Sequence, residues 1–315
     1  MSEAGFPIFR FAGLPGAVRG ALWLMAANAC FSAMAGVVRV VAAEMHPFEI
    51  AFFRASFGAL LMAPLLLRFG RRSLATTRFP MYLARGAAMV VSTLGWFTAV
   101  AHMPIVEVTA LTFTSPLFAT LGAGLFLREA VGARRWTATL VGFAGAMIVL
   151  RPGLVDLSAP AVAAMASAAS TAAGLLIVKS LSRTDSPGTI VLYLNLLMVP
   201  MSLAPAALVW TPPSLEALVW LAGLGLIANL GHLSFARAMA ATEASAIAPV
   251  DFCKLFFTAA LGYLAFAEVP DALTWVGAAV IFGSSIYAAR RESLAGGRGA
   301  APTGAAPSAG PGVST

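Results

Sequence analysis

The sequence predicts an all-α integral membrane protein with ten transmembrane helices, arranged as two inverted five-helix repeats. The first observation is composition: of 315 residues, 60% are hydrophobic and 10% are charged. A soluble chain carries about 25% charged residues because water must wet its surface. Lipid is therefore the expected solvent of this chain. The other two observations are the spacing of the apolar runs and the recurrence of residues at an almost constant offset in the two halves.

Ten apolar runs follow one another along the chain. A helix that crosses the hydrocarbon core needs about 20 such residues, and ten of them leave no room for a separate soluble domain. We interpret the first run as a retained helix, because it lacks a convincing signal-peptide cleavage site. The runs are approximately 20–42, 48–67, 80–101, 105–127, 136–151, 159–179, 188–209, 215–236, 244–266 and 272–289.

Lys and Arg in the loops set the predicted orientation. If the amino terminus is cytoplasmic, the opposite set of loops holds Arg151, with Arg39 near a boundary. Because positive residues stay on the cytoplasmic side, both termini are predicted to lie inside. The cytoplasmic set is Arg10, Arg19, Arg68, Arg71, Arg72, Arg78, Arg128, Arg134, Arg135, Lys179, Arg183, Arg237, Arg290, Arg291 and Arg298.

Several residues recur at an almost constant offset, which indicates an internal repeat. Five spans per half would insert the second half upside down, an architecture typical of alternating-access carriers. Offsets of 139 or 140 residues relate Val38-Arg39 to Val178-Lys179, Pro47 to Pro187, Ile50 to Ile190, Glu129 to Glu268, and Trp136 to Trp275. The predicted organisation is a cytoplasmic segment 1–19, a first repeat 20–151, a second repeat 152–290 and a disordered cytoplasmic tail 291–315.

A set of motifs carries a family resemblance. They are Pro47-Phe-Glu-Ile-Ala-Phe-Phe-Arg54, Ser115-Pro116-Leu-Phe118 leading to Arg128-Glu129, Trp136 through Gly142 to Gly145, Ala248-Pro249, Leu261-Gly262-Tyr263 to Glu268-Val-Pro270-Asp271, Trp275 and Gly277. Over roughly residues 20–290 the chain resembles the EamA family of the drug/metabolite transporter superfamily. The resemblance implies ten helices, cytoplasmic termini and secondary transport of small metabolites. The second half is most similar to the subgroup of S-adenosylmethionine and riboflavin carriers.

Charged side chains at membrane depth are expensive and therefore mark candidate functional residues. Lys254 is predicted roughly 15 Å from the cytoplasmic end of its run, with Asp251 one turn shallower on the same face. Either they pair and orient the helix, or Lys254 contacts an anionic group of the substrate and Asp251 is its counter-ion or a proton acceptor. Arg54 either holds a substrate carboxylate or locks its helix to backbone carbonyls. Arg85 is expected to snorkel to the cytoplasmic surface, and Arg39 to snorkel or to gate the outer mouth.

Uncharged polar groups complete the candidate site. Asn28, Ser32, Asn195 and Asn229 are predicted either to contact substrate or to join helices. Ser115 precedes Pro116, where a kink is expected, and Pro249 occupies the corresponding place. Trp96, beside Phe97, offers a stacking face or belongs to the core. The candidate substrate-binding residues are Lys254, Asp251, Arg54, Asn28, Ser32, Trp96, Ser115, Asn195 and Asn229.

The sequence predicts a secondary transporter that moves a small organic metabolite across the bacterial inner membrane by alternating access. Amino acids, cofactors and vitamins such as S-adenosylmethionine or riboflavin are the implied substrates. The alternatives are an amino-acid or drug-type exporter of the same fold and, from another class, a membrane channel or non-transporting receptor.

Other activities and partners are constrained more weakly. No nucleophile–base pair, metal-ligand spacing or phosphate-binding loop supports an enzyme or a cofactor. The net charge of +7 is spread between apolar runs, so no nucleic acid is expected. Membrane lipid and a small-molecule substrate are the expected partners. Proton coupling stays open, with Asp251 and Glu107 as candidate groups, and the oligomeric state stays open with a monomer as one option.

Overall fold

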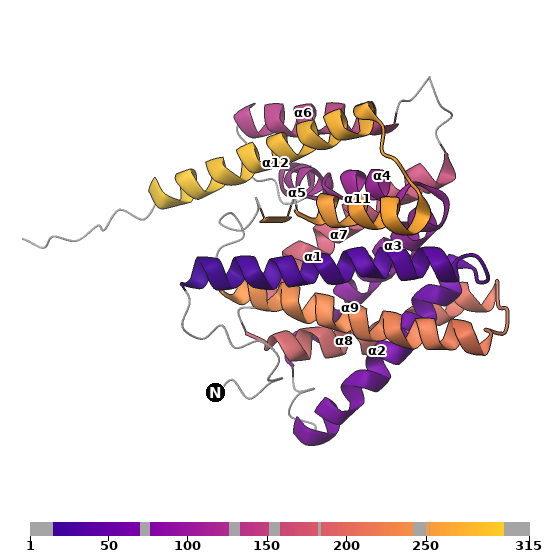
Figure 1. Cartoon of the computed structure of the whole chain (residues 1–315). Helices are drawn as coiled ribbons and strands as arrows, with labels where there is room; N and C mark the ends of the chain where they lie inside the picture. Colours follow the sequence, from indigo (N-terminus) through magenta and orange to yellow (C-terminus); the bar gives the residue numbers. More distant parts are fainter. Residues whose placement is uncertain are drawn as a thin grey trace, which may run out of the picture.

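The computed structural model describes residues 15–69, 76–125, 133–150, 158–181, 184–241, 250–251 and 253–298. Within these ranges the regular secondary structure is helical, and the helices form one bundle (Figure 1). The helices are α1 Gly16–Val41, α2 Pro47–Phe69, α3 Phe79–His102, α4 Ile105–Thr112, α5 Ser115–Leu125, α6 Ala133–Leu150, α7 Ala159–Leu181, α8 Pro187–Ala207, α9 Leu215–Ala241, α11 Cys253–Phe266 and α12 Ala272–Arg298.

Within the described residues each predicted apolar run overlaps a helix, and residues 244–249 of the ninth run lie outside these residues. The fourth run is split, because α4 ends at Thr112 and α5 begins at Ser115, directly before Pro116. A proline frees the carbonyl four residues earlier and favours such a break, so the predicted kink is confirmed there. The equivalent Pro249 lies outside the described residues, as do Glu129 and Arg151.

The last helix is longer than predicted. Residues 291–298, where a disordered tail was expected to begin, belong to α12. Ala, Arg, Glu and Leu are good helix formers, and this stretch contains all four, which explains the extension. The remaining tail, 299–315, lies outside the described residues.

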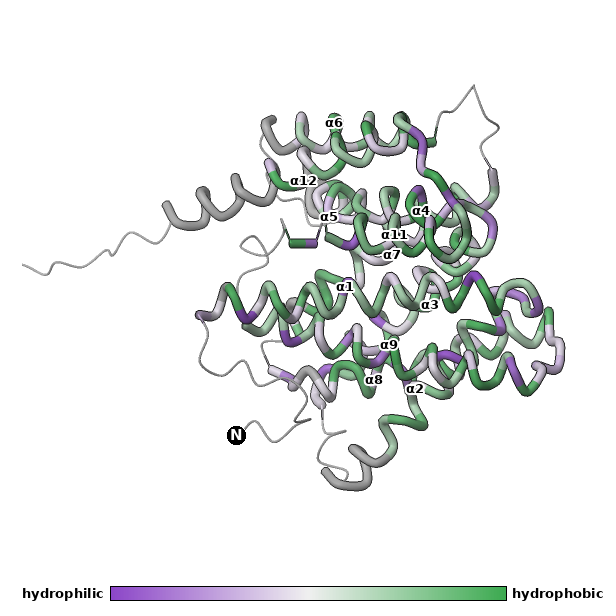
Figure 2. The backbone as a smooth tube through the Cα atoms, in the orientation of Figure 1, coloured by the Kyte–Doolittle hydropathy of each residue, from purple (hydrophilic) through white to green (hydrophobic). Residues whose placement is uncertain are grey.

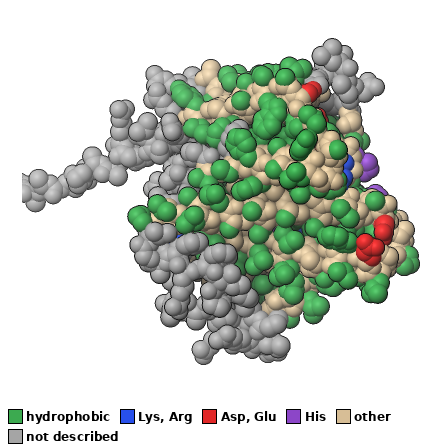
Figure 3. Space-filling view, in the orientation of Figure 1, with side chains coloured by type: hydrophobic (Ala, Val, Ile, Leu, Met, Phe, Trp, Pro, Cys, Tyr) green, Lys and Arg blue, Asp and Glu red, His purple; other side chains and the backbone are tan. Residues whose placement is uncertain are grey.

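Six segments are long and apolar enough to cross a membrane: Val18–Val41, Phe79–His102, Ile105–Gly122, Ala159–Val178, Gly188–Ala207 and Leu215–Ala241. Shorter apolar helices cover Trp136–Leu150, Cys253–Phe266 and Ala272–Ser284. Hydrophobic residues dominate the helices (Figure 2), and hydrophobic side chains cover the face seen in Figure 3. Large apolar residues such as Leu60, Val219 and Leu264 are exposed on the outside. The protein is therefore a multi-pass membrane protein.

Three helix pairs pack most extensively: α1 with α9, α3 with α7, and α6 with α12. Glycine permits the close approach of α6 and α12. A Cβ atom at Gly145 would lie 2.9 Å from the carbonyl oxygen of Gly277, and one at Gly277 would lie 2.8 Å from that of Gly145. The backbones of α6 and α12 therefore touch, as small residues allow in membrane bundles.

The two ends of the bundle differ in what lies there. In Figure 1, α1 begins and α12 ends on the same side of the bundle. The loops that join α1 to α2, α8 to α9 and α11 to α12 lie at the opposite end. We call this opposite end the loop end. The packed core between the ends supports the site described next.

Candidate substrate site

Lys254 lies in the first turn of α11, half-buried, with its ammonium 5.8 Å from the centre of the Phe31 ring. Asn28, one turn earlier on α1, directs its amide at the backbone carbonyls of Val250 at 3.5 Å and Asp251 at 3.4 Å. These contacts hold the backbone of Val250 and Asp251, which precede α11, against α1. A cation over an aromatic face is attracted by the ring quadrupole, so Phe31 holds the ammonium without neutralising it.

Asp251 and Lys254, both within the described part of the chain, are not joined by an ion pair within 4.0 Å. Their charges still influence each other across the turn. Among the residues that the structure describes, the three hydrogens of the ammonium therefore have no carboxylate partner in this conformation. A ligand acceptor beside Phe31 would meet an available donor.

Arg54 is the largest fully buried side chain of the described residues, with 2% of its surface exposed. Its Nη2 lies 3.1 Å from the sulfur of Met198 on α8, and its Nε has no hydrogen-bond partner within the described ranges. The guanidinium thus contacts a weak acceptor instead of the backbone carbonyls that one hypothesis required. Arg54 is a buried cation held between α2 and α8.

Arg85 behaves differently from the prediction. The side chain is 5% exposed and its Nη1 donates to the carbonyl of Ile190 on α8 at 2.8 Å, although its Nε finds no partner in the described part of the chain. The expectation that Arg85 snorkels to the surface is therefore wrong. The long side chain can reach inward as well as outward, and the packing of α3 on α8 directs it inward.

Sequence reasoning missed His232 on α9. Its ring packs edge-to-face against Phe31 with 5.3 Å between centroids, and it lies within electrostatic reach of Arg54 and Arg85. Phe31 and His232 thus connect the surroundings of Lys254 to those of Arg54. A signal was present, because His232 lies three residues after Asn229 and Phe31 three after Asn28, which places each pair on one helix face.

Three buried hydroxyls, those of Ser32, Ser115 and Thr274, have no hydrogen-bond partner among the described residues, and the first two belong to predicted site residues. Most helical hydroxyls in the described ranges, such as Thr109 and Ser202, donate to a carbonyl one turn earlier. Ser32 on α1 and Ser115 at the start of α5 are 3% and 5% exposed, and their Oγ atoms have no partner among the same residues. Buried polar groups normally have a partner, so these two hydroxyls are available to a ligand.

Asn195 and Asn229 are brought together in a hydrogen-bond network. Asn195 donates to the Asn229 side chain at 2.7 Å and to the Val191 carbonyl at 3.2 Å. Asn229 in turn donates to the Gly58 carbonyl at 2.9 Å. Their amides therefore join α2, α8 and α9, which corresponds to the interhelical hypothesis.

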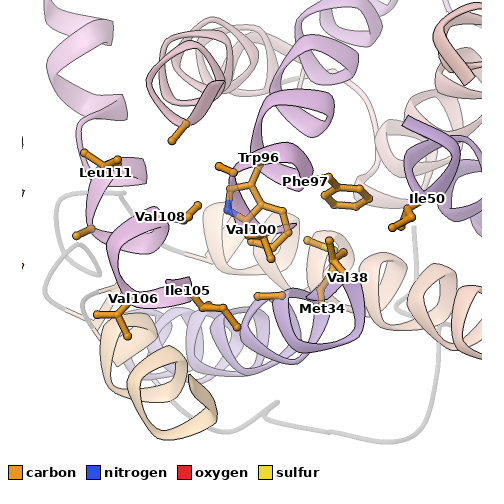
Figure 4. Close-up of a cluster of buried hydrophobic side chains, with 14 of the residues drawn as sticks. Met34, Val38, Ile50, Trp96, Phe97, Val100, Ile105, Val106, Val108 and Leu111 are labelled. Atoms are coloured by element: carbon orange, nitrogen blue, oxygen red, sulfur yellow. The ribbon is translucent and has the colours of Figure 1, made fainter. Parts of the chain in front are cut away.

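Trp96 lies in an apolar cluster built by α1, α2, α3 and α4 (Figure 4). The Trp96 and Phe97 rings are 5.6 Å apart, and both side chains are buried. In Figure 4 the indole is surrounded by Val100, Val108 and Phe97. Here Trp96 packs as core and presents no free stacking face.

A second charged cluster, which we call the outer clasp, consists of Arg39 and Glu268 at the loop end. Arg39 Nη2 pairs with Glu268 Oε1 at 2.7 Å and also donates to the Met103 carbonyl. Glu268 Oε2 accepts from the Ile105 backbone N–H at 2.8 Å, at the start of α4. A carboxylate at a helix N-terminus is favourable. The clasp therefore ties α1, the α3–α4 turn and the α11–α12 loop together.

The described ranges contain no group of three or more His, Cys, Asp or Glu side chains that could bind a metal ion. The chemistry of the site is instead that of cations, amides and hydroxyls around aromatic rings. Such a set recognises an organic solute by charge and hydrogen bonds.

Comparisons with known proteins identify the class. The EamA-like transporter family matches residues 18–151 and again residues 159–290. A riboflavin transporter of Vibrio cholerae is 36% identical over 282 residues, which cover 88% of this chain and 94% of that protein. An S-adenosylmethionine uptake transporter of Rickettsia bellii is 28% identical over 273 residues, which cover 87% and 94%.

One solved crystal structure has the same fold, with a TM-score of 0.61 at 16% sequence identity, over 87% of this chain and 98% of that one. The chain belongs to the EamA-like transporter family. It is a small-metabolite transporter, and the relatives above are named transporters, not enzymes. The predicted family and transport class are thereby confirmed.

Proposed function

We propose that the protein is a secondary transporter with ten membrane spans in two inverted halves, 20–151 and 152–290, which moves its metabolite by alternating access. The membrane is the bacterial inner membrane and both termini are cytoplasmic. The observation that carries this proposal is the symmetry with which helices of the two halves pair. Six of the nine sequence-predicted residues supply the candidate substrate contacts, whereas Trp96 packs in the core and Asn195 and Asn229 join helices. The six are Lys254, Asp251, Arg54, Asn28, Ser32 and Ser115.

The set of helix–helix contacts stays the same when the two halves are interchanged. If α1, α2, α3, α5 and α6 correspond to α7, α8, α9, α11 and α12, then the α1–α9 pair corresponds to α7–α3. The α2–α9 pair likewise corresponds to α8–α3, and α1–α11 to α7–α5; all six pairs are in contact. The α2–α8 and α6–α12 pairs correspond to themselves. A twofold axis in the membrane plane produces this pattern.

Side-chain contacts repeat in the same way. A Cβ at Gly86 on α3 would lie 3.2 Å from the Leu197 Cβ on α8. A Cβ at Gly225 on α9 would lie 2.8 Å from the Phe57 Cβ on α2. Gly225 follows Gly86 by 139 residues and Leu197 follows Phe57 by 140, the offsets of the sequence repeat. Equivalent glycines therefore receive equivalent side chains, which supports the inverted repeat.

The outer clasp supports a conformation closed toward the outside. It joins α1, which packs on α9 and α11, to the start of α4, which packs on α7. Arg39 comes from the first half and Glu268 from the second. In alternating access the clasp has to separate when the outer side opens.

The named relatives make riboflavin the first candidate substrate, and S-adenosylmethionine the second. Transport of riboflavin is said of a relative at 36% identity, and that of S-adenosylmethionine of one at 28%. Both solutes carry rings and hydrogen-bonding groups, which suits a site with Phe31, His232 and buried hydroxyls available to a ligand.

Counterflow in proteoliposomes tests the mechanism. Vesicles with the purified chain are loaded with unlabelled riboflavin or S-adenosylmethionine, and labelled solute is added outside. A carrier accumulates label transiently and saturates, whereas a channel gives linear flux and a receptor gives none.

A cross-linking arm tests the outer opening. In a background with Cys30 and Cys253 replaced by Ala, Arg39→Cys and Glu268→Cys are joined by a short, reducible bis-thiosulfonate reagent. Transport should stop on cross-linking and return on reduction, while the single-cysteine variants stay active with the reagent. Continued counterflow by fully cross-linked protein would exclude alternating access through this opening.

A further inference from the structure

The buried and half-buried cations of the spans differ in what balances their charge. Arg39 has the carboxylate of Glu268 at 2.7 Å. Lys254 lies over Phe31 and shares its helix turn with Asp251. The remaining buried cation is Arg54 on α2.

Arg85 has two sources of compensation. It donates to the Ile190 carbonyl at 2.8 Å, and it lies within electrostatic reach of Tyr82. The Tyr82 hydroxyl in turn donates to the Asp185 carboxylate at 2.6 Å. Arg85 therefore has a hydrogen-bond acceptor and lies near a tyrosine that is bonded to a carboxylate.

Arg54 has neither a carboxylate nor a carbonyl in that role within the described ranges. Among these residues, its one hydrogen-bond acceptor is the Met198 sulfur at 3.1 Å, and its Nε has none. Arginine cannot lose its proton inside a protein, so the charge stays. A charge kept in a buried site without a partner is strongly unfavourable, and a purely apolar side chain would fill the space at lower cost.

The geometry of the guanidinium defines the ligand that would relieve this cost. Its planar fork of donors matches the oxygen pairs of a carboxylate or phosphate. His232 lies within electrostatic reach of Arg54, and Phe31 links His232 to Lys254, so a second cation lies further along the same row of contacts. The row has a cation at each end, with Asp251 beside Lys254 at one end.

We propose that the transported metabolite carries a carboxylate or phosphate group, and that Arg54 binds this group. The proposal rests on the transport function proposed above and adds the chemical class of the substrate. It favours S-adenosylmethionine, which has a carboxylate, over riboflavin, which has neither a carboxylate nor a phosphate. In the conformation described, Met198 occupies the acceptor position that the anionic group takes when substrate is bound.

The test uses membrane vesicles from cells with and without the full-length chain, incubated with a metabolite extract of the same cells. Mass spectrometry then identifies the compounds whose uptake exceeds that of empty vesicles. Variants are Arg54→Met, Arg54→Lys and, as a matched control, Leu203→Ala, an exposed position on α8.

The expected transported compounds carry a carboxylate or phosphate. Arg54→Met should reduce their uptake by about 10- to 100-fold, the loss that follows from one charged hydrogen-bonding partner. Arg54→Lys should retain part of their uptake and Leu203→Ala nearly all of it. In detergent, Arg54→Met should unfold at the same temperature as the wild type or higher, because an unpaired buried charge is removed.

Two outcomes overturn the proposal. Transported compounds without an anionic group would exclude it, and so would wild-type uptake by a folded Arg54→Met variant. Uptake of no compound above the empty-vesicle level would instead refute the transport function itself, and the substrate class with it. If Arg54→Met fails to fold, Arg54→Gln replaces it, since the amide keeps polarity without charge, and the same criteria apply.

Discussion

The outer clasp and the interior around Arg54 contain the same kind of side chain in opposite circumstances. Arg39 has a carboxylate at 2.7 Å and a backbone carbonyl, whereas Arg54 has a thioether sulfur at 3.1 Å. The charge of Arg39 is partly exposed and paired with a carboxylate, whereas the charge of Arg54 is buried and has no carboxylate of a described residue within 4.0 Å. The Nε atoms of both arginines lack a hydrogen-bond partner among the described residues. The difference teaches that the charge of Arg39 at the loop end joins helices, and it supports the proposal that the buried charge of Arg54 binds a solute.

The largest effect is expected at Lys254. Lys254→Met should reduce counterflow by about 100-fold, because the ammonium beside Phe31 has no carboxylate of a described residue within 4.0 Å and is free for substrate. Counterflow in proteoliposomes measures the loss, and the unfolding temperature in detergent confirms folding. Phe256→Leu, an exposed position on the same helix, is the matched control. Unchanged transport by Lys254→Met would remove Lys254 from the site and weaken the contrast with the clasp.

An intermediate effect is expected at the clasp. Arg39→Ala, Glu268→Gln and the double variant form a cycle, and the amide oxygen introduced by Glu268→Gln can still accept from the Ile105 N–H. We expect a coupling free energy of about 1–3 kcal/mol, because the pair is partly buried and charge-assisted. Unfolding in mixed detergent and SDS measures it. A coupling near zero would show that the clasp contributes geometry without stability.

The same clasp variants separate stability from recognition. Since Arg39 and Glu268 lie at the loop end, the half-saturating substrate concentration should change little while the maximal rate changes. A large rise in the half-saturating concentration would place the clasp in the binding site and contradict the difference between the clasp and the interior around Arg54.

The smallest effect is expected at Ala267, directly before Glu268. Its φ is +54°, a left-handed conformation that glycine adopts freely and alanine does not. The N–H groups of Ala267 and Glu268 bond back to Tyr263 and Gly262, so this residue closes the C-terminus of α11. Ala267→Gly should stabilise the protein by about 0.5–1 kcal/mol, measured by the same unfolding assay. Destabilisation would mean that the methyl group packs favourably and outweighs the backbone strain.

Much of the fold followed from the sequence because the hydrophobic pattern is local. Apolar runs about a span long fold as helices whatever their neighbours, since no water satisfies the backbone. The break before Ser115 was predictable for the same reason, as proline acts on its own helix. The extension of α12 was missed because polarity was read as disorder, although the residues are good helix formers.

The candidate site was only partly predictable. Asn28, Asp251 and Lys254 do lie together, and Ser32, Ser115 and Arg54 do retain buried atoms without a partner among the described residues. The amides of Asn195 and Asn229, however, are hydrogen-bonded to each other, and Trp96 is enclosed by apolar side chains. His232 was overlooked because its partners come from other helices.

Composition, the spacing of apolar runs and the loop charges determined that this chain is a helical membrane protein with a repeated half, because each depends on the chain alone. Which buried side chains are satisfied was decided by tertiary structure. Arg54 and Arg85 look alike in the sequence, yet one faces a sulfur and the other a carbonyl of the same helix, α8. Helix periodicity fixes neighbours three and four residues away, but the partner across an interface depends on how two helices are set against each other.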